Sequence, residues 1–108
     1  MTIAEWIERR STGVPRTLTS DVLASLGADA RLDASETPRA CVAAATRVLE
    51  SLLREESYGR DSAGRLLAAD ALTTFAFEYA AEAASSAREL AALAENAAQR
   101  VGSLAGKP

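Results

Sequence analysis

The residue types that most often perform chemistry in proteins are scarce in this chain. The sequence contains no histidine, so it lacks the commonest general base, the commonest metal ligand and every Ser-His or Cys-His nucleophile arrangement. Because buried carboxylates are rare, we interpret the acidic side chains as a solvated helix face rather than as ligands. The acids considered for an all-carboxylate metal site are Glu50, Glu56, Asp61, Glu78 and Glu82. The sequence therefore predicts no catalytic, metal or cofactor site.

A single cysteine, Cys41, is the other residue with reactive chemistry. It lies on the apolar stripe of a predicted helix, and Arg39, only two residues away, points elsewhere on that helix. We therefore expect a buried thiol that packs as a small apolar side chain. One cysteine cannot form an internal disulfide, which fits a reducing compartment such as the cytoplasm.

Composition limits the classes of protein to which the chain can belong. It has 108 residues, 48% of them apolar, and a net charge of −3, as expected for one folded domain. The arginines have acids nearby and form no basic stripe, which argues against nucleic-acid binding. The first residues are acidic, unlike a signal peptide, and no apolar stretch is long enough for a membrane span. We therefore expect a cytoplasmic protein.

The elements that must position these residues are all predicted to be helices. Local signals mark their ends: a capping box at Thr2 and Glu5, a C-terminal Gly27, an N-cap and first-turn pair at Thr37 and Pro38, and a second capping box starting at Ser86. We place a break at Ser86 because one helix from 62 to 101 would be long for this domain. The prediction is one all-α domain over 1–108, a small antiparallel bundle of four to five helices. Its predicted segments are helices 2–11, 16–26, 38–57, 62–84 and 86–101, and a frayed tail 102–108.

Apolar spacings of three and four residues predict the side chains that fill the core. The predicted core residues are Val48, Leu49, Leu52, Leu53, Leu67, Leu72, Phe75, Tyr79, Leu90 and Leu93. Large amphipathic rings are favoured at binding hot spots, so Trp6 is a candidate anchor; alternatively, it plugs the end of the bundle. The candidate partner contacts are Ile3, Trp6, Val101 and Leu104.

One stretch of the sequence resembles a known enzyme family. Residues 67–78, Leu-Ala-Ala-Asp-Ala-Leu-Thr-Thr-Phe-Ala-Phe-Glu, resemble a helix of trans-prenyl diphosphate synthases. Ala69 stands in place of the usual glycine, and both aspartate-rich magnesium motifs of that family are absent. The resemblance therefore implies a packing role for Asp70 and, at most, a non-catalytic partner subunit, because the diphosphate needs metal to leave.

A second resemblance lies at the end of the sequence. Residues 101–107, Val-Gly-Ser-Leu-Ala-Gly-Lys, are similar to the cargo-loading peptide of encapsulin nanocompartments. The resemblance implies an extended tail that places Val101 and Leu104 in pockets of a shell protein. The usual flexible linker before such a peptide is missing.

Taken together, these patterns predict a non-enzymatic helical adaptor or accessory subunit. Its partner would be another protein, a larger complex (membrane-bound ones included) or a second copy of the chain. The alternatives are an encapsulin-type cargo protein, a prenyl-synthase-like partner subunit, and a carrier for an apolar ligand. For the carrier we expect a pocket lined by Leu49, Leu53, Phe75 and Tyr79.

Overall fold

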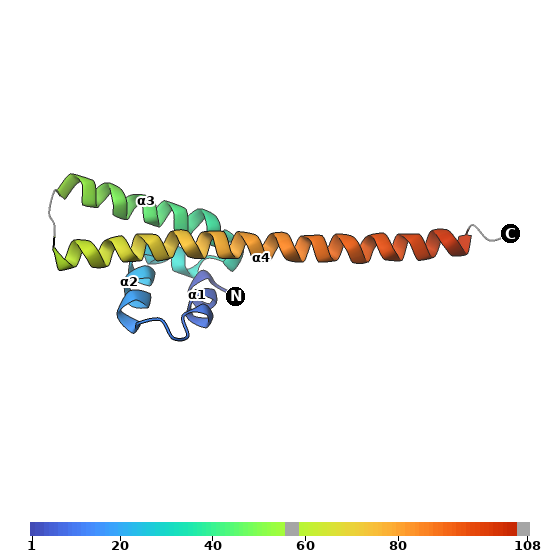
Figure 1. The fold of residues 1–108 in the computed structure, drawn as a ribbon, viewed down its shortest axis with the longest axis horizontal. Coiled ribbons are helices and arrows are strands. Elements are labelled where there is room, and N and C mark those ends of the chain that lie inside the picture. Colours follow the sequence, from blue (N-terminus) through green and yellow to red (C-terminus); the bar gives the residue numbers. More distant parts are fainter. Residues whose placement is uncertain (56–58, 106–108) are drawn as a thin grey trace.

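Helices make up nearly all of the chain, and the last helix is by far the longest (Figure 1). The computed structural model describes residues 1–55 and 59–105. The elements are α1 (Ile3–Arg10), α2 (Arg16–Leu26), the 3-10 helices η1 (Gly27–Arg31) and η2 (Ala34–Glu36), α3 (Thr37–Glu55) and α4 (Arg60–Ala105). Within the described residues, extended pairing is limited to one bridge between Thr2 and Asp33. The predicted all-helical class is confirmed.

The first helix begins at the predicted capping box. The Glu5 backbone N–H donates to Thr2 Oγ1 at 3.1 Å, and the Thr2 backbone N–H donates to Glu5 Oε1 at 3.1 Å. These two bonds satisfy N–H groups that a helix start otherwise leaves unpaired. Hydrogen bonding to the Thr2 backbone also lowers the pKa of the Glu5 carboxyl below its usual range.

The second helix spans Arg16–Leu26, as predicted, and Gly27 ends it with a φ of +58°. Side chains with a Cβ rarely adopt this conformation, which explains a glycine at the stop. The following residues, which lie between two of the predicted helices, form η1 and η2 and bind the start of the chain. The Ile3 N–H donates to the Leu32 carbonyl, and the Ala34 N–H donates to the Met1 carbonyl, both at 2.9 Å.

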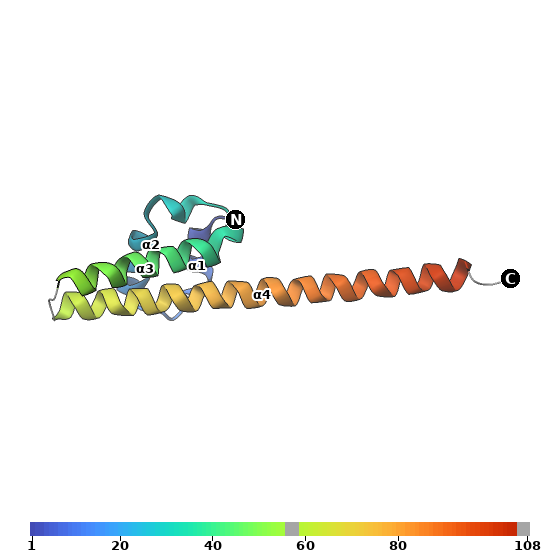
Figure 2. The same ribbon diagram turned by 90° about the horizontal axis from the view of Figure 1, so that it is seen from above.

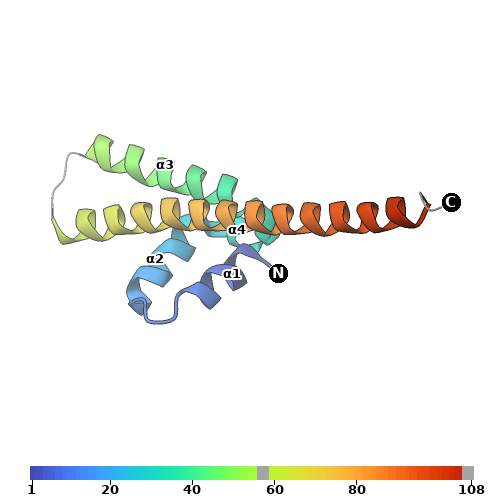
Figure 3. The ribbon, with the colours of Figure 1, turned by 45° about the vertical axis from the view of Figure 1, so that its right-hand side comes forward.

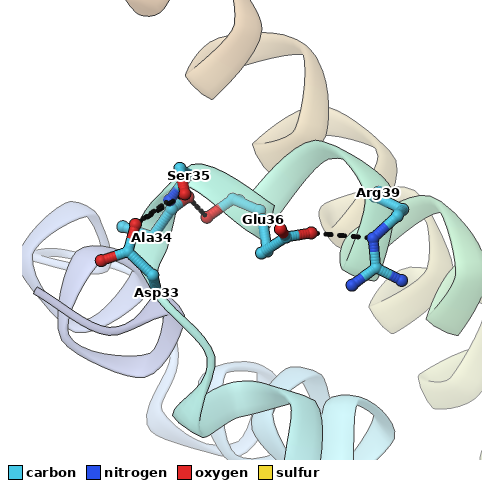
Figure 4. Close-up of polar contacts among 6 residues, drawn as sticks. Asp33, Ala34, Ser35, Glu36 and Arg39 are labelled. Carbon is cyan, nitrogen blue, oxygen red and sulfur yellow. Dashed lines mark hydrogen bonds and ion pairs between the residues drawn. The ribbon is translucent and has the colours of Figure 1, made fainter.

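The start of α3 differs from the predicted N-cap at Thr37. The η2 turn runs directly into α3, so Thr37 already has helical φ and ψ angles of −53° and −49°. Its hydroxyl donates to the Ala34 carbonyl at 2.5 Å instead of accepting from the helix. The capping role belongs to Asp33, whose carboxylate accepts from the Ser35 N–H at 3.0 Å and the Ser35 hydroxyl at 2.6 Å (Figure 4). The predicted end of this helix at 57 lies outside the described residues.

The predicted break at Ser85 and Ser86 is absent, and α4 is one continuous helix of 46 residues. Alanines surround the two serines, and alanine is the strongest helix former, while a serine costs only about 0.5 kcal/mol in a helix. The capping signal at Ser86 is therefore not used. The helix also continues through Gly102 to Ala105, so the predicted frayed tail starts too early; 106–108 lie outside the described residues.

The hydrophobic core joins α1, α2, α3 and the first half of α4. In Figures 1 and 3, α3 runs beside this half of α4 in the opposite direction, while α2 packs against both α4 and α3. The largest fully buried side chains include Ile3, Ile7, Val22 and Leu72. Many of the remaining core residues are alanines of α3 and α4, which let the two backbones approach closely. These alanines are Ala40, Ala44, Ala45, Ala68, Ala69 and Ala76.

The predicted core is only partly correct. Leu72 is buried, and Val48, Phe75 and Tyr79 pack against the core while half-buried, as is Leu52. Leu49, Leu53 and Leu67 are exposed, because they lie on sides of α3 and α4 that no described element covers. Leu90 and Leu93 are exposed because α4 has extended beyond the other helices at these positions. The prediction of these five leucines as core residues is wrong for the single chain.

The molecule is strongly elongated. It measures 77 × 26 × 22 Å, and its radius of gyration is 20.0 Å, whereas a compact domain of this length has about 13 Å. We call residues 1–79 the head and residues 80–105 the arm. The arm projects from the head as a single helix (Figures 1 and 2), about 39 Å long at 1.5 Å per residue. The chain is thus more extended than the compact bundle that we expected.

Candidate functional site

Trp6 closes the head where the arm begins. Its ring packs edge-on against Phe75, with ring centroids 5.9 Å apart, and against Tyr79 at 5.3 Å. Edge-to-face pairs of this kind add stability beyond the buried area. Trp6 is 8% exposed and Ile3 is completely buried. These two predicted partner contacts therefore belong to the core, and Trp6 takes the alternative role of a plug.

Arg10 fixes α1 to the base of the arm. Its guanidinium lies over the Trp6 ring, 4.7 Å from the centroid. It also forms ion pairs with Glu78, at 3.2 Å, and with Glu82 in the first turn of the arm. The sequence analysis did not single out Arg10. The signal was present, since a cation four residues after an aromatic residue lies directly above it on a helix.

The arm is the most exposed part of the described chain. Every side chain from residue 80 to residue 104 is exposed. Large apolar residues are among them: Leu90 is 67% exposed, Val101 is 66% exposed and Leu104 is 72% exposed. The predicted contacts Val101 and Leu104 therefore lie at the surface, on a helix rather than on an extended tail.

The large apolar residues of the arm lie on one side of the helix, together with some of its many alanines. They follow one another in steps of three and four residues, the spacing that keeps side chains on one face. We call this row the seam; it consists of Ala83, Ala87, Leu90, Ala94, Ala97, Val101 and Leu104. The same steps lead back through Tyr79 to Ala76 and Leu72, both of which the head buries. The seam is therefore the exposed continuation of the face that forms the core.

The opposite side of the arm mixes polar residues with alanines and carries no large apolar side chain. Arg88, Glu95 and Gln99 lie about half a turn away from the seam, by the 100° that each residue advances in a helix. An amphipathic helix with its apolar face open is unusual in a protein that stays alone in water. This contrast makes the seam the strongest candidate for a functional surface in the described residues.

Exposed leucines on α3 form a second, smaller apolar row. Val42, Leu49 and Leu53 follow one another at seven and four residues, and Leu53 is 80% exposed. The apolar-ligand pocket that we expected is not formed by its four predicted residues. Leu49 and Leu53 face solvent, whereas Phe75 and Tyr79 pack on Trp6.

A depression of about 440 Å³ lies between α2 and the start of α4. Its lining is mainly small and polar: Thr17, Asp21, Ala24, Ser25, Asp61, Gly64, Arg65 and Ala68. Arg65 is held by α3, since it donates to Glu55 at 2.6 Å and to the Ser51 hydroxyl at 2.5 Å. The bond from Arg65, together with one that the Ser51 hydroxyl donates to Glu55 at 3.2 Å, lowers the pKa of the Glu55 carboxyl. Arg65 therefore joins α3 to α4.

The residues with reactive chemistry occupy structural or solvated positions. Burial raises the pKa of the Cys41 thiol to about 11, which makes its thiolate scarce at neutral pH. Glu50 and Asp61 are exposed, Glu78 and Glu82 are paired with Arg10, and Glu56 lies outside the described residues. In residues 1–55 and 59–105, no three acids or cysteines gather as metal ligands.

Asp70 does not have the packing role that the prenyl-synthase resemblance implied. Its side chain is exposed, and its backbone carbonyl accepts a bond from the Thr74 hydroxyl at 3.0 Å.

None of the helices in the described part of the chain has the length and apolar character needed to cross a bilayer. Comparison of the chain with protein-family models, curated proteins and solved structures finds no match.

Proposed function

We propose that this chain is a non-enzymatic helical adaptor or accessory subunit that works by protein–protein contact through its arm. The observation that carries the proposal is the seam: an apolar row that continues the core face of α4 and is open along its whole length. Helices are held in water mainly by packing their apolar face, not by intrinsic propensity. A partner helix on the seam supplies that packing.

The head gives the arm a fixed origin and direction. At the end of the head next to the arm, the Trp6 ring packs against Phe75 and Tyr79. Arg10 joins α1 to α4 by ion pairs with Glu78 and Glu82. A contact surface on a rigid element is presented more precisely than one on a loop. In this proposal the head holds the arm in a fixed orientation, and the arm binds the partner.

Other properties of the chain suit this role. The proposed location is the cytoplasm, where a free thiol such as that of Cys41 stays reduced. Nothing in the proposal requires a cofactor, because contact alone performs the function. The proposed partner is a protein or a larger assembly that offers an apolar helical surface to the seam.

The experiment is co-purification of the full chain at native expression levels, followed by mass spectrometry. The test variant is Leu90→Glu with Val101→Glu, which places two charges on the seam without touching the head. The matched control is Ala92→Glu with Gln99→Glu on the other side of the arm. We expect the control to keep its bound proteins and the seam variant to lose them. Equal recovery with both variants, for a chain that is also monomeric in solution, would refute contact through the seam.

A further inference from the structure

We propose that the seam binds a second copy of this chain, with the two arms antiparallel and related by a two-fold axis. This inference rests on the proposed function, because it names the partner of the arm. It is argued from the position of the head, the order of large and small residues along the seam, and the charges beside it.

The position of the head permits only one direction for a second copy. A partner helix on the seam lies on the same side of α4 on which the head covers Leu72 and Ala76. A parallel copy would run from the seam into that head, because its own residues 60–79 precede its arm. An antiparallel copy instead ends at the head, and its own head lies beyond residue 105. The arm therefore accepts an antiparallel copy without collision.

The order of residues along the seam fits an antiparallel pair. When Ala94 lies on the two-fold axis, each large seam residue is level, to within one residue, with a seam alanine of the second copy: Leu90 with Ala97, Val101 with Ala87 and Leu104 with Ala83. Large residues opposite small ones keep the two helix axes evenly spaced and fill the interface without voids. A parallel pair in register would instead place leucine on leucine and alanine on alanine, which alternates wide and narrow layers.

The charges beside the seam are complementary in the same register. Glu89 and Arg100 flank one edge of the seam, and they are about 16 Å apart along their own helix, too far to pair. In the antiparallel register, Arg100 lies beside Glu89 of the second copy, and the two-fold axis produces this pair twice. Leu93 lies on the same edge, close to the axis, where it meets its own copy. The other edge carries Ala84, Ala91 and Ala98, which allow close approach.

The arms would overlap over residues 83–104, about 32 Å of helix. This is a small interface, and only a few large side chains per copy enter it, so we expect a dissociation constant on the order of 10 µM. The dimer therefore forms and dissociates over a range of protein concentrations at which solution methods can measure the equilibrium.

The first test is sedimentation equilibrium of the full chain from about 1 to about 300 µM, a range that brackets the expected constant. We expect a monomer–dimer equilibrium for the natural chain and for Ala92→Glu, and a monomer for Leu90→Glu with Val101→Glu. Glu89→Arg and Arg100→Glu should each weaken dimerisation roughly two- to fivefold, as exposed ion pairs do, and the double variant should restore it. Failure of the double variant to restore it would overturn the proposed register.

The second test measures the direction of the arms by the distance between spin labels at Ser103→Cys in the dimer. The native Cys41 is buried and its thiol has a high pKa, so labelling is selective. We expect the labels about 30 Å apart along the axis for antiparallel arms; a single short distance would mean parallel arms and would overturn the proposal.

The two proposals fail in different ways. A chain that stays monomeric throughout, yet loses a different bound protein when Leu90 and Val101 are replaced, would refute the second copy and keep the arm as a contact surface. A monomer whose bound proteins are the same for the natural chain, the seam variant and the control would refute both.

Discussion

Trp6 and Arg10 lie one helical turn apart on α1 and act together at the end of the head. The ring of Trp6 contacts two aromatic rings of α4 and is covered by the Arg10 guanidinium. Arg10 in turn pairs with two carboxylates of α4. A residue that looks like a binding anchor in the sequence is therefore part of the internal joint between α1 and α4.

Replacement of Trp6 by alanine should destabilise the head strongly. The substitution leaves a cavity beside Phe75 and Tyr79 and removes the surface on which Arg10 rests, so we expect a loss of roughly 3–5 kcal/mol in the free energy of unfolding. Trp6→Phe, which keeps an apolar ring, should cost less. Urea unfolding followed by circular dichroism measures both; a loss below about 1 kcal/mol for Trp6→Ala would contradict the role of plug.

Acid should weaken the connection between α3 and α4. Hydrogen bonds from Arg65 and Ser51 lower the pKa of the Glu55 carboxyl in the folded chain. As the pH falls, the unfolded chain binds the proton first. The contribution of Glu55 is therefore complete above the ordinary carboxyl pKa and is lost as the pH falls through the lowered folded-state pKa.

Arg65→Gln tests this connection, because it removes the partner and should flatten that part of the pH dependence. Urea unfolding from about pH 6 to about pH 3 covers the relevant range. The control is Arg88→Gln, which removes the same charge from the arm. It should leave the fall in the free energy of unfolding at low pH unchanged. If the curves of the natural chain and Arg65→Gln have the same slope, Glu55 does not contribute in this way.

At the scale of the elements, the arm should be stable only when its seam is covered. All side chains of residues 80–104 are exposed, so in a monomer only alanine-rich helix propensity holds them. We expect arm amides to exchange hydrogen quickly in dilute solution and about fivefold more slowly at a protein concentration near ten times the dissociation constant.

Hydrogen exchange with mass spectrometry at two protein concentrations tests this expectation. Peptides from α1 and α3 serve as an internal reference, because the head is folded in both states. The Leu90→Glu, Val101→Glu variant should show rapid arm exchange at both concentrations. Arm exchange that does not depend on concentration in the natural chain would show that a second copy does not protect it.

The ends of the short helices could be predicted because their signals are local. Thr2 and Glu5 form their bonds within one turn, and Gly27 needs only its own backbone conformation. The signal at Ser86 and Glu89 has the same pattern but lies in an alanine-rich stretch where continuing the helix costs little. Sequence pattern alone does not tell a cap that is used from one that the helix overrides.

The core could be predicted only in part, because periodicity shows which face is apolar but not how much of it is covered. Leu49 and Leu53 extend the stripe of α3, yet the helices of the head cover only the side that carries Cys41 and Ala44. Leu90 belongs to the seam, and Leu93 lies beside it; the same face of α4 is buried at Leu72. The length of α4 relative to its neighbours decides where burial stops, and that length depends on the absent break.

On the scale of the whole molecule, the chain divides its residues between a small head and a long single helix. Alanines let the head pack closely around α4, and the ion pairs of Arg10 fix the base of the arm. The proposed function uses this shape: the head holds one end, and the seam offers an apolar row to another helix. Reactive side chains have no part in it.

Small-angle X-ray scattering over increasing protein concentration tests the central claim most directly. One molecule is 77 Å long, and two that overlap through about 32 Å of antiparallel arm should reach a maximum dimension of about 120 Å. We predict growth to this value for the natural chain and for Ala92→Glu, with Leu90→Glu, Val101→Glu remaining near 77 Å. A natural chain that doubles in mass without lengthening, or never doubles at all, would contradict the antiparallel pairing of the arms.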